Sequence, residues 1–389
     1  MLDRARAIEE QLVRWRRDIH AHPELGFEET RTAALVAQAL ESLGYRVRTG
    51  VGRTGVVGER GEGPPVVAIR ADMDALPIQE ANDLPFASQT PGVMHACGHD
   101  AHTAIALGVA TLLAKEEHPG TVRFLFQPSE EKADEEGLSG APRLVEAGAM
   151  EGVDAILALH VNGGSPVGEI TLNAGPSSAG VDSFWATISG KGAHGAYPHK
   201  GLDPVHIAGH VILALHGIVS RRLNPFDPAV VTVGSIHAGQ ANNIIPEKVE
   251  LAGTIRYENP EVQGLIHAEI EQALSVARAL GGDYKLTIRH GAPPVVNDER
   301  IVDLLREVAG DLLGQDRVQP REKGMGAEDF AVFTALAPGA MFRLGCQLEG
   351  DERKAHNPTF DLDERCLPIG AAILAEAALR LLRRGGVDG

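Results

Sequence analysis

The run Val66-Val67-Ala68-Ile69-Arg70-Ala71-Asp72-Met73-Asp74 decides the fold class of this chain. Its first four residues are apolar, as expected of a short strand that is buried inside a sheet. Residues 122–126 and 155–159 have the same apolar character, and residues 101–115 show helical spacing. Strands that alternate with helices predict an α/β domain with a mixed, mostly parallel, doubly wound sheet.

Polar residues of the kind that bind metals follow each of these three strands. Asp72 and Asp74 follow the first strand, Glu130 and Glu131 follow the second, and His160 follows the third. Open α/β sheets place their sites just beyond the carboxyl ends of the strands. The sequence therefore predicts one site at this edge of the sheet.

The middle of the chain has a different pattern. It predicts strand, helix, strand, strand, helix and strand over residues 181–189, 204–221, 229–237, 248–257, 260–280 and 284–290. This βαββαβ order is typical of the ferredoxin-like α+β motif. We therefore predict an inserted satellite domain over 177–291, and a catalytic metal-binding domain formed by 1–176 and 292–389. In the last portion we expect helices near 298–313, 327–336 and 366–384, and a strand near 340–345.

Composition excludes several classes of function. The net charge of −17 over 389 residues argues against nucleic acid and anionic membranes as partners, because a polyanion would be repelled. No apolar run reaches about 18 residues, so no membrane-spanning helix is expected. The three cysteines, Cys97, Cys346 and Cys366, are too few for a disulfide framework. The first residues contain no apolar signal segment, and we therefore expect a cytoplasmic protein.

Cys97-Gly98-His99 places a thiol and an imidazole within one turn. A single cysteine is more often a small buried apolar residue than a ligand. His95, His99 and His102 lie around this one, which favours a metal site. A thiolate can bridge two metals and a neutral imidazole cannot, so Cys97 is the candidate for a shared ligand. His95 and His102 are interpreted as bystanders.

Glu130 and Glu131 are adjacent acids at a strand end. They could simply belong to a charged loop, because Asp134, Glu135 and Glu136 follow closely. Neighbouring side chains can, however, point in different directions, and a general base must be a carboxylate that is not a ligand. We assign Glu130 as base and Glu131 as ligand, and the reverse order stays open.

Asp74 is interpreted as the acid that accepts a hydrogen bond from a ligating histidine and so fixes its tautomer. A turn with solvated aspartates is the alternative, and Asp72 could be purely structural. His160 is either a ligand or a hydrogen-bonded core histidine. Four or five such donors exceed what one catalytic metal needs, and two metals about 3.5–4 Å apart are a recurring hydrolytic device. The sequence thus indicates a metallohydrolase.

Residues 190–199 form a Gly-rich turn with His194 near its centre. The spacing fits neither a Walker loop nor a dinucleotide loop. His194 could approach a ligand closely, or the segment could be a solvated hairpin. By themselves, Asn243 and Arg256 are weak candidates for a functional site. An arginine on a strand usually lies on an exposed face.

Several motifs occur together in a specific order. They are His22-Pro23-Glu24-Leu25-Gly26-Phe27-Glu28-Glu29, Arg70-Ala71-Asp72-Met73-Asp74-Ala75-Leu76-Pro77, Met94-His95-Ala96-Cys97-Gly98-His99-Asp100, Gln127-Pro128-Ser129-Glu130-Glu131, Gly190-Lys191-Gly192 with His194, and Gly326-Ala327-Glu328-Asp329-Phe330. In this order they resemble the M20 metallopeptidase family nearly from end to end. The resemblance is greatest to its amidohydrolase subgroup of N-acyl-amino-acid amidohydrolases (aminoacylases), hippurate hydrolases and auxin-conjugate hydrolases.

The resemblance implies a centre of two divalent metal ions. Glu130 would be the general base, and Asp74 would be the acid that orients the metal centre. The implied ligands are Cys97, His99, Glu131, His160 and His356. A thiolate favours zinc, with manganese, cobalt or nickel as alternatives.

The resemblance also implies that the satellite domain mediates formation of a homodimer or a higher homo-oligomer. His194 would reach an active site, of its own chain or of a partner, and donate to the oxyanion. Asn243 and Arg256 would hold the carboxylate of the substrate.

We therefore expect metal-dependent hydrolysis of the amide bond of N-acyl amino acids. A metallocarboxypeptidase or dipeptidase with the same centre is the alternative among enzymes, and a non-catalytic binding protein is the alternative outside them. The expected partner is a small N-acyl amino acid or a short peptide.

Overall fold

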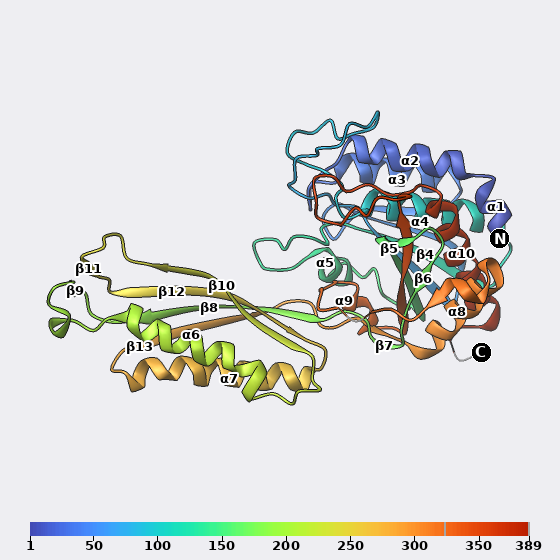
Figure 1. Cartoon of the computed structure of the whole chain (residues 1–389). Helices are drawn as coiled ribbons and strands as arrows, with labels where there is room; N and C mark the ends of the chain where they lie inside the picture. Colours follow the sequence, from blue (N-terminus) through green and yellow to red (C-terminus); the bar gives the residue numbers. More distant parts are fainter. Residues whose placement is uncertain (323, 388–389) are drawn as a thin grey trace. The chain divides into compact units, whose positions relative to one another are not determined.

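The computed structural model describes residues 1–322 and 324–387 (Figure 1). The chain divides into two compact units. Unit 1 consists of Met1–Ser177, Val296–Glu322 and the chain from Asp329 onward, whereas unit 2 consists of Ser178–Val295 with residues 324–328. Each unit has its own buried apolar core.

Unit 1 is built on an eight-stranded sheet with the strand order β1-β2-β4-β3-β5-β16-β6-β15. The strands are β1 (Arg46–Val51), β2 (Gly55–Glu62), β3 (Val66–Asp72), β4 (Gly120–Gln127), β5 (Ala155–Pro166), β6 (Ile170–Thr171), β15 (Val318–Gln319) and β16 (Gly339–Gln347). The central strands β4, β3, β5 and β16 pair in parallel, and antiparallel pairs join β1 to β2, β2 to β4 and β16 to β6. The predicted α/β class with a mixed, mostly parallel sheet is confirmed.

The helices of unit 1 cover this sheet. They are α1 (Leu2–Arg6), α2 (Glu9–Ala21), α3 (Thr30–Ser42), α4 (His99–Leu113), α5 (Gly140–Glu146), α8 (Glu299–Leu313), α9 (Ala331–Thr334) and α10 (Cys366–Arg384), with a 3₁₀ turn η2 (Gln315–Arg317). The helices α4 and α10 contact each other and the strands β3 and β5, and α2 packs on α4. Almost every residue of α4 is buried, which fixes its first turn firmly against the sheet. A short pair, β7 (Gly175–Pro176) with β14 (Val296–Asn297), completes the unit.

Unit 2 is a four-stranded antiparallel sheet with two helices. The sheet has the order β10-β12-β8-β13. Its elements in chain order are β8 (Gly180–Ser189), α6 (Pro204–Arg221), β10 (Ala229–Ala238), β12 (Lys248–Tyr257), α7 (Pro260–Ala279) and β13 (Asp283–His290). Alternate residues of β8 are buried, because one face of the sheet packs against apolar residues of α6 and α7. A small pair, β9 (Ala193–His194) with β11 (Ile244–Ile245), and a 3₁₀ turn η1 (Pro198–Lys200) extend from this sheet.

The carboxyl ends of β3 and β4 position the site of unit 1. Asp72 ends β3 and Gln127 ends β4, so Asp74, Glu130 and Glu131 follow within four residues of these ends. His160 differs from the expectation, because it lies inside β5 and does not follow it. The strand continues to Pro166 because it pairs with β16 well beyond the point where β3 ends.

Candidate metal centre

Cys97 and His99 are placed by the start of α4, which begins at His99. Gly98 between them has a φ of 93°, a left-handed conformation that favours glycine. A Cβ atom at this position would lie 2.4 Å from Cγ2 of Val161. Both the left-handed backbone and the close approach of Val161 therefore require glycine at this position. The turn at Gly98 directs the Cys97 thiol and the His99 imidazole to one site.

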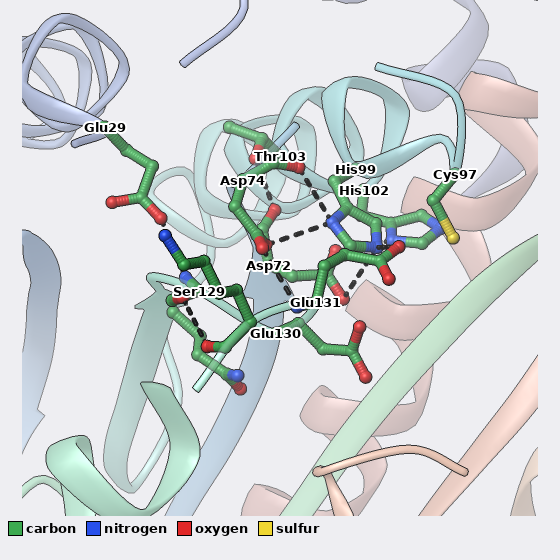
Figure 2. A network of polar contacts seen from close by, with 12 residues as sticks. Glu29, Asp72, Asp74, Cys97, His99, His102, Thr103, Ser129, Glu130 and Glu131 are labelled. Carbon is green, nitrogen blue, oxygen red and sulfur yellow. Dashed lines mark hydrogen bonds and ion pairs between the residues drawn. The ribbon is translucent and has the colours of Figure 1, made fainter. Parts of the chain in front are cut away.

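Asp74 orients His99. Nδ1 of His99 lies 2.9 Å from the carbonyl oxygen of Asp74 and 3.2 Å from its Oδ1 atom, so Nδ1–H is the donor (Figure 2). Nε2 of His99 then faces Glu131, whose Oε1 atom is 3.9 Å away. The other oxygen of Asp74 accepts the backbone N–H of Glu131 at 3.0 Å. One carboxylate thus fixes both the tautomer of a predicted ligand and the backbone of a second one.

His160 is oriented in the same manner. Its Nδ1 lies 2.7 Å from the carbonyl oxygen of Val161 and donates to it, which leaves Nε2 directed at Cys97 with 3.5 Å between nitrogen and Sγ. Burial, and after it the positive charge of Arg343, lower the pKa of His160 well below its usual range. The ring is therefore neutral and offers a lone pair, as a metal ligand must.

Glu131 and His356 come from distant parts of the chain and meet at the site. Nε2 of His356 lies 3.1 Å from Oε1 of Glu131. The loop of His356 is held by its backbone N–H, which donates to the carbonyl oxygen of Ala96 at 2.7 Å. The contact with Glu131 raises the pKa of His356. Oε1 of Glu131 is nevertheless buried without a well-aligned hydrogen bond to any residue that the structure describes.

Glu130 lies beside these donors. Figure 2 shows Glu130 and Glu131 leaving one loop, and carboxylate oxygens of both lie within 4.8 Å of a ring nitrogen of His99. Oε1 of Glu130 is also 3.5 Å from the backbone nitrogen of Asp329. Both acids therefore reach the candidate centre, and the division into a base and a ligand stays a prediction.

The donors form two overlapping groups. In one, Cys97, His99 and His160 offer atoms within 4.8 Å of one another, and in the other Cys97, Glu131 and His356 do the same. Cys97 belongs to both groups. Sulfur, nitrogen and oxygen donors in such groups suit zinc and its neighbours.

Electrostatics at the site also fits bound cations. Burial raises the pKa of the Cys97 thiol to about 12, and a coordinated cation would offset this because it deprotonates a thiol outright. Burial acts to lower the pKa of His99, yet the Asp72 carboxylate and Cys97 raise it well above its usual range. The surrounding groups thus stabilise positive charge at this point. The buried Oε1 atom of Glu131, which has no well-aligned hydrogen bond, also indicates a place for a cation.

Asp72 and His102 form a neighbouring network that uses both ring nitrogens of His102. Nδ1 of His102 donates to Oδ1 of Asp72 at 2.6 Å, and its Nε2 accepts the backbone N–H of Val161 at 3.0 Å. Arg70 donates to the second oxygen of Asp72 at 2.6 Å. Because both ring nitrogens of His102 are used, its interpretation as a bystander fits the geometry, and the structural role of Asp72 stays a prediction.

Two residues that hold the Glu130 loop had no place in the sequence-based prediction. Oε1 of Glu29 accepts the backbone N–H of Ser129 at 2.7 Å. The carboxylate of Asp329 accepts Gln127 Nε2 at 2.8 Å and Ser139 Oγ at 2.6 Å. Glu29 ends the motif over residues 22–29, and Asp329 lies within the motif over residues 326–330. Their role in holding the Glu130 loop is visible only from their contacts in the structure.

The three remaining predicted site residues all lie in unit 2. His194 pairs with Ile244 between β9 and β11, and the backbone N–H of Gly195 donates to the Asn243 carbonyl at 2.7 Å, so His194 and Asn243 are brought together. Arg256 lies near the far end of β12, eight residues beyond Lys248, where that strand begins. At about 3.3 Å per residue this is roughly 26 Å along the strand, so unit 2 does not bring Arg256 together with the other two.

Known proteins are similar to this chain over nearly its whole length. The sequence profile of peptidase family M20/M25/M40 matches residues 68–380. The chain belongs to this family. The M20 chain is 40% identical over 390 residues to an IAA-amino acid hydrolase of Arabidopsis thaliana, covering 97% of its own length and 88% of that protein. It is 39% identical over 383 residues to a thermostable carboxypeptidase of Saccharolobus solfataricus, covering 96% and 95% of the two chains.

The description of one similar solved structure mentions metal binding. A dinuclear metal binding peptidase of the M20 family from Bacillus subtilis superposes with a TM-score of 0.84 at 37% identity, covering 97% of the M20 chain and 99% of that one. The predicted resemblance and the prediction of a metal-dependent hydrolase are thereby confirmed. Among the described residues, no helix is both long enough and apolar enough to cross a bilayer.

Proposed function

We propose that this M20 enzyme hydrolyses the amide bond of N-acyl amino acids at a centre of two divalent metal ions, with Glu130 as general base. The observation that carries the proposal is the pair of donor groups that share Cys97, with the Glu130 carboxylate beside them. The relative whose name specifies an amino-acid conjugate as substrate supports the acyl amino acid.

The residues divide the work as follows. Cys97, His99, Glu131, His160 and His356 would hold the metals. Bound divalent ions supply Lewis acidity, which polarises an amide carbonyl and lowers the pKa of water. Glu130 accepts a proton from the attacking water and delivers it to the leaving nitrogen, so the products are a carboxylic acid and a free amino acid. Asp74 keeps His99 in the tautomer that presents Nε2.

Zinc is the metal that we propose first, because the donor set contains a thiolate, with manganese, cobalt and nickel as alternatives. The roles that the resemblance gives to His194, Asn243 and Arg256 remain predictions, as do a homodimer or higher homo-oligomer formed through the satellite domain and a cytoplasmic location. Loss of an oxyanion donor costs about 10²–10³ in kcat, so His194→Ala tests the first of these roles.

The test of the proposed function compares Glu130→Gln with the wild type. The glutamine retains the shape of the side chain but cannot accept the proton. Because general-base catalysis contributes about 10²–10⁴ in rate, kcat should fall by that factor while metal content is unchanged. Substrates are N-acetyl, N-benzoyl (including hippurate) and dipeptide forms of one amino acid, supplied to chelator-stripped protein after addition of Zn²⁺, Mn²⁺ or Co²⁺.

Glu135→Gln is the matched control, since it removes an acid from the same loop at a position whose side chain is 87% exposed. Near-normal kcat in Glu130→Gln would refute the assignment of the base. Turnover of dipeptides without turnover of any acyl amino acid would establish the alternative, a dipeptidase or carboxypeptidase, which the name of the Saccharolobus solfataricus relative favours.

A further inference from the structure

A cavity of about 690 Å³ opens on unit 1 beside the metal centre. His160, a predicted metal ligand, forms part of its wall. The cavity therefore shares one wall residue with the candidate metal centre, and its other wall residues lie on the side of the sheet that His160 faces. Its lining combines polar and apolar residues, and the polar ones include Arg343, Thr171 and Gln319.

These side chains form a row across the sheet. On β16, Arg343 is the register partner of His160 on β5 and of Thr171 on β6, and Thr171 is in turn the partner of Gln319 on β15. Register partners on adjacent strands project from the same face, with about 4.8 Å between the strands. Arg343 therefore lies one strand away from a metal ligand, on the cavity side of the sheet.

Arg343 is half-buried, and no hydrogen bond or ion pair joins it to a residue that the structure describes. Other cations of the cavity wall are occupied: Arg353 donates to Asp351 at 2.7 Å, and Lys354 lies 4.0 Å from Glu352. Glu169 also lines the cavity, yet it is not within ion-pair distance of Arg343. A guanidinium that faces a cavity without a protein partner is free to bind an anionic ligand, because no internal ion pair has to be broken first.

We infer that Arg343 binds a carboxylate of the substrate and so determines specificity within the catalytic unit. The inference rests on the proposed function and goes beyond the roles assigned to unit 2. A planar guanidinium binds a carboxylate through two parallel hydrogen bonds, and the Thr171 hydroxyl and the Gln319 amide continue the polar surface outward. The carboxylate is either the α-carboxylate of the amino acid or a second one on the acyl chain.

Binding without turnover tests this inference directly. N-acetyl-L-alanine, its C-terminal amide and N-succinyl-L-alanine are titrated by calorimetry into zinc-loaded Glu130→Gln protein, with and without the additional change Arg343→Gln. Hydrogen bonds to charged groups contribute about 1.5–3 kcal/mol, so Kd for a carboxylate-bearing ligand should rise by about 10- to 100-fold. Arg343→Lys, which retains the charge but not the two-pronged geometry, should give a smaller rise.

The three ligands distinguish the source of the carboxylate. A rise for N-acetyl-L-alanine but not for its amide identifies the α-carboxylate, and a rise for N-succinyl-L-alanine alone identifies the acyl chain. Either result supports the inference. Equal Kd values with and without Arg343→Gln for all three ligands, or an equal rise for all three including the amide, would overturn it.

Two controls separate other causes. Arg306→Gln removes one positive charge from α8, where the arginine pairs with Asp303, and it should leave every Kd unchanged. Thermal unfolding of each variant checks that the fold is intact. Absence of turnover in the wild type would refute the proposed function, whereas a Kd that does not respond to Arg343→Gln refutes only this inference.

Discussion

Glu29 shows how a single buried carboxylate can shape the site from outside it. It accepts the backbone N–H of Ser129, a residue with a φ of 44°, next to the proposed base Glu130. Thr54 donates to its second oxygen. Burial raises the pKa of Glu29 from 4.5 to about 7. The loop of the base is therefore fixed by a group whose ionised form is costly in the folded state.

This pKa predicts how stability depends on pH. Below pH 4.5 Glu29 is protonated in the folded and the unfolded protein, and no cost arises. Between pH 4.5 and about 7 the unfolded chain ionises first, so the contribution of Glu29 to stability falls as pH rises. Glu29→Gln preserves an oxygen for Ser129 and removes this cost. The free energy of unfolding of the variant, relative to that of the wild type, should therefore increase from pH 4.5 to about 7, by up to about 3 kcal/mol.

Urea unfolding of metal-stripped protein at a series of pH values measures the difference. Metal-stripped protein is used because ligand protonation would add its own pH dependence. Glu28→Gln, at the exposed neighbouring position, controls for the loss of one negative charge. A difference between Glu29→Gln and wild type that stays constant from pH 4.5 to 7 would contradict the role of Glu29.

The sequence predicts the residues of this site that resemble ligands by their chemistry, but not the residues that hold them. Cys97, His99 and Glu131 stand out because a thiol, an imidazole and a carboxylate occur at strand or helix ends. Glu29 and Arg343 are ordinary residue types whose roles arise from contacts over long sequence distances. Such contacts depend on strand register and loop path, which no local pattern specifies.

At the scale of elements, Arg16 joins the helices around the site. It is fully buried on α2 and donates to Asp100 of α4 at 2.9 Å and to Asp361, shortly before α10, at 2.8 Å. Arg16→Met should destabilise the protein by about 3–5 kcal/mol, because Asp361 would lose its buried cation and Asp100 would retain only the contact with His20. Arg17→Met is the matched control, since the adjacent arginine is 47% exposed and its ion pair should contribute only about 0–1 kcal/mol.

Denaturant unfolding of both variants measures the two effects. Similar losses for Arg16→Met and Arg17→Met would show that the buried network adds nothing beyond a surface ion pair. A loss confined to Arg16→Met would show that α2, α4 and the start of α10 are held together through one guanidinium. In that case the first turn of α4, which carries His99, depends on contacts made by α2.

The helix and strand predictions are correct where a periodic pattern is long. They fail where tertiary contacts determine the ends of an element. The helix expected over 327–336 is present only as Ala331–Thr334. Asp329, just before it, instead accepts hydrogen bonds from Gln127 and Ser139, which flank the Glu130 loop. Strand β5 runs past its glycines to Pro166 because β16 pairs with it there.

At the scale of the whole molecule, the two units have separate cores, and all predicted metal ligands lie in unit 1. A ligand stabilises only the structure that binds it, by about 2.7 kcal/mol when its concentration is 100 times Kd. Removing the metal should therefore lower the unfolding midpoint of unit 1 and leave that of unit 2 unchanged.

The two tryptophans make this measurable, because Trp15 lies on α2 of unit 1 and Trp185 on β8 of unit 2. In Trp185→Phe the remaining fluorescence reports unit 1, and in Trp15→Phe it reports unit 2. Chelator should shift the midpoint reported by Trp15 downward, and adding back Zn²⁺ should restore it. Equal shifts from both tryptophans would mean that the units unfold as one cooperative block, and the separate cores would then not behave as independent folding units.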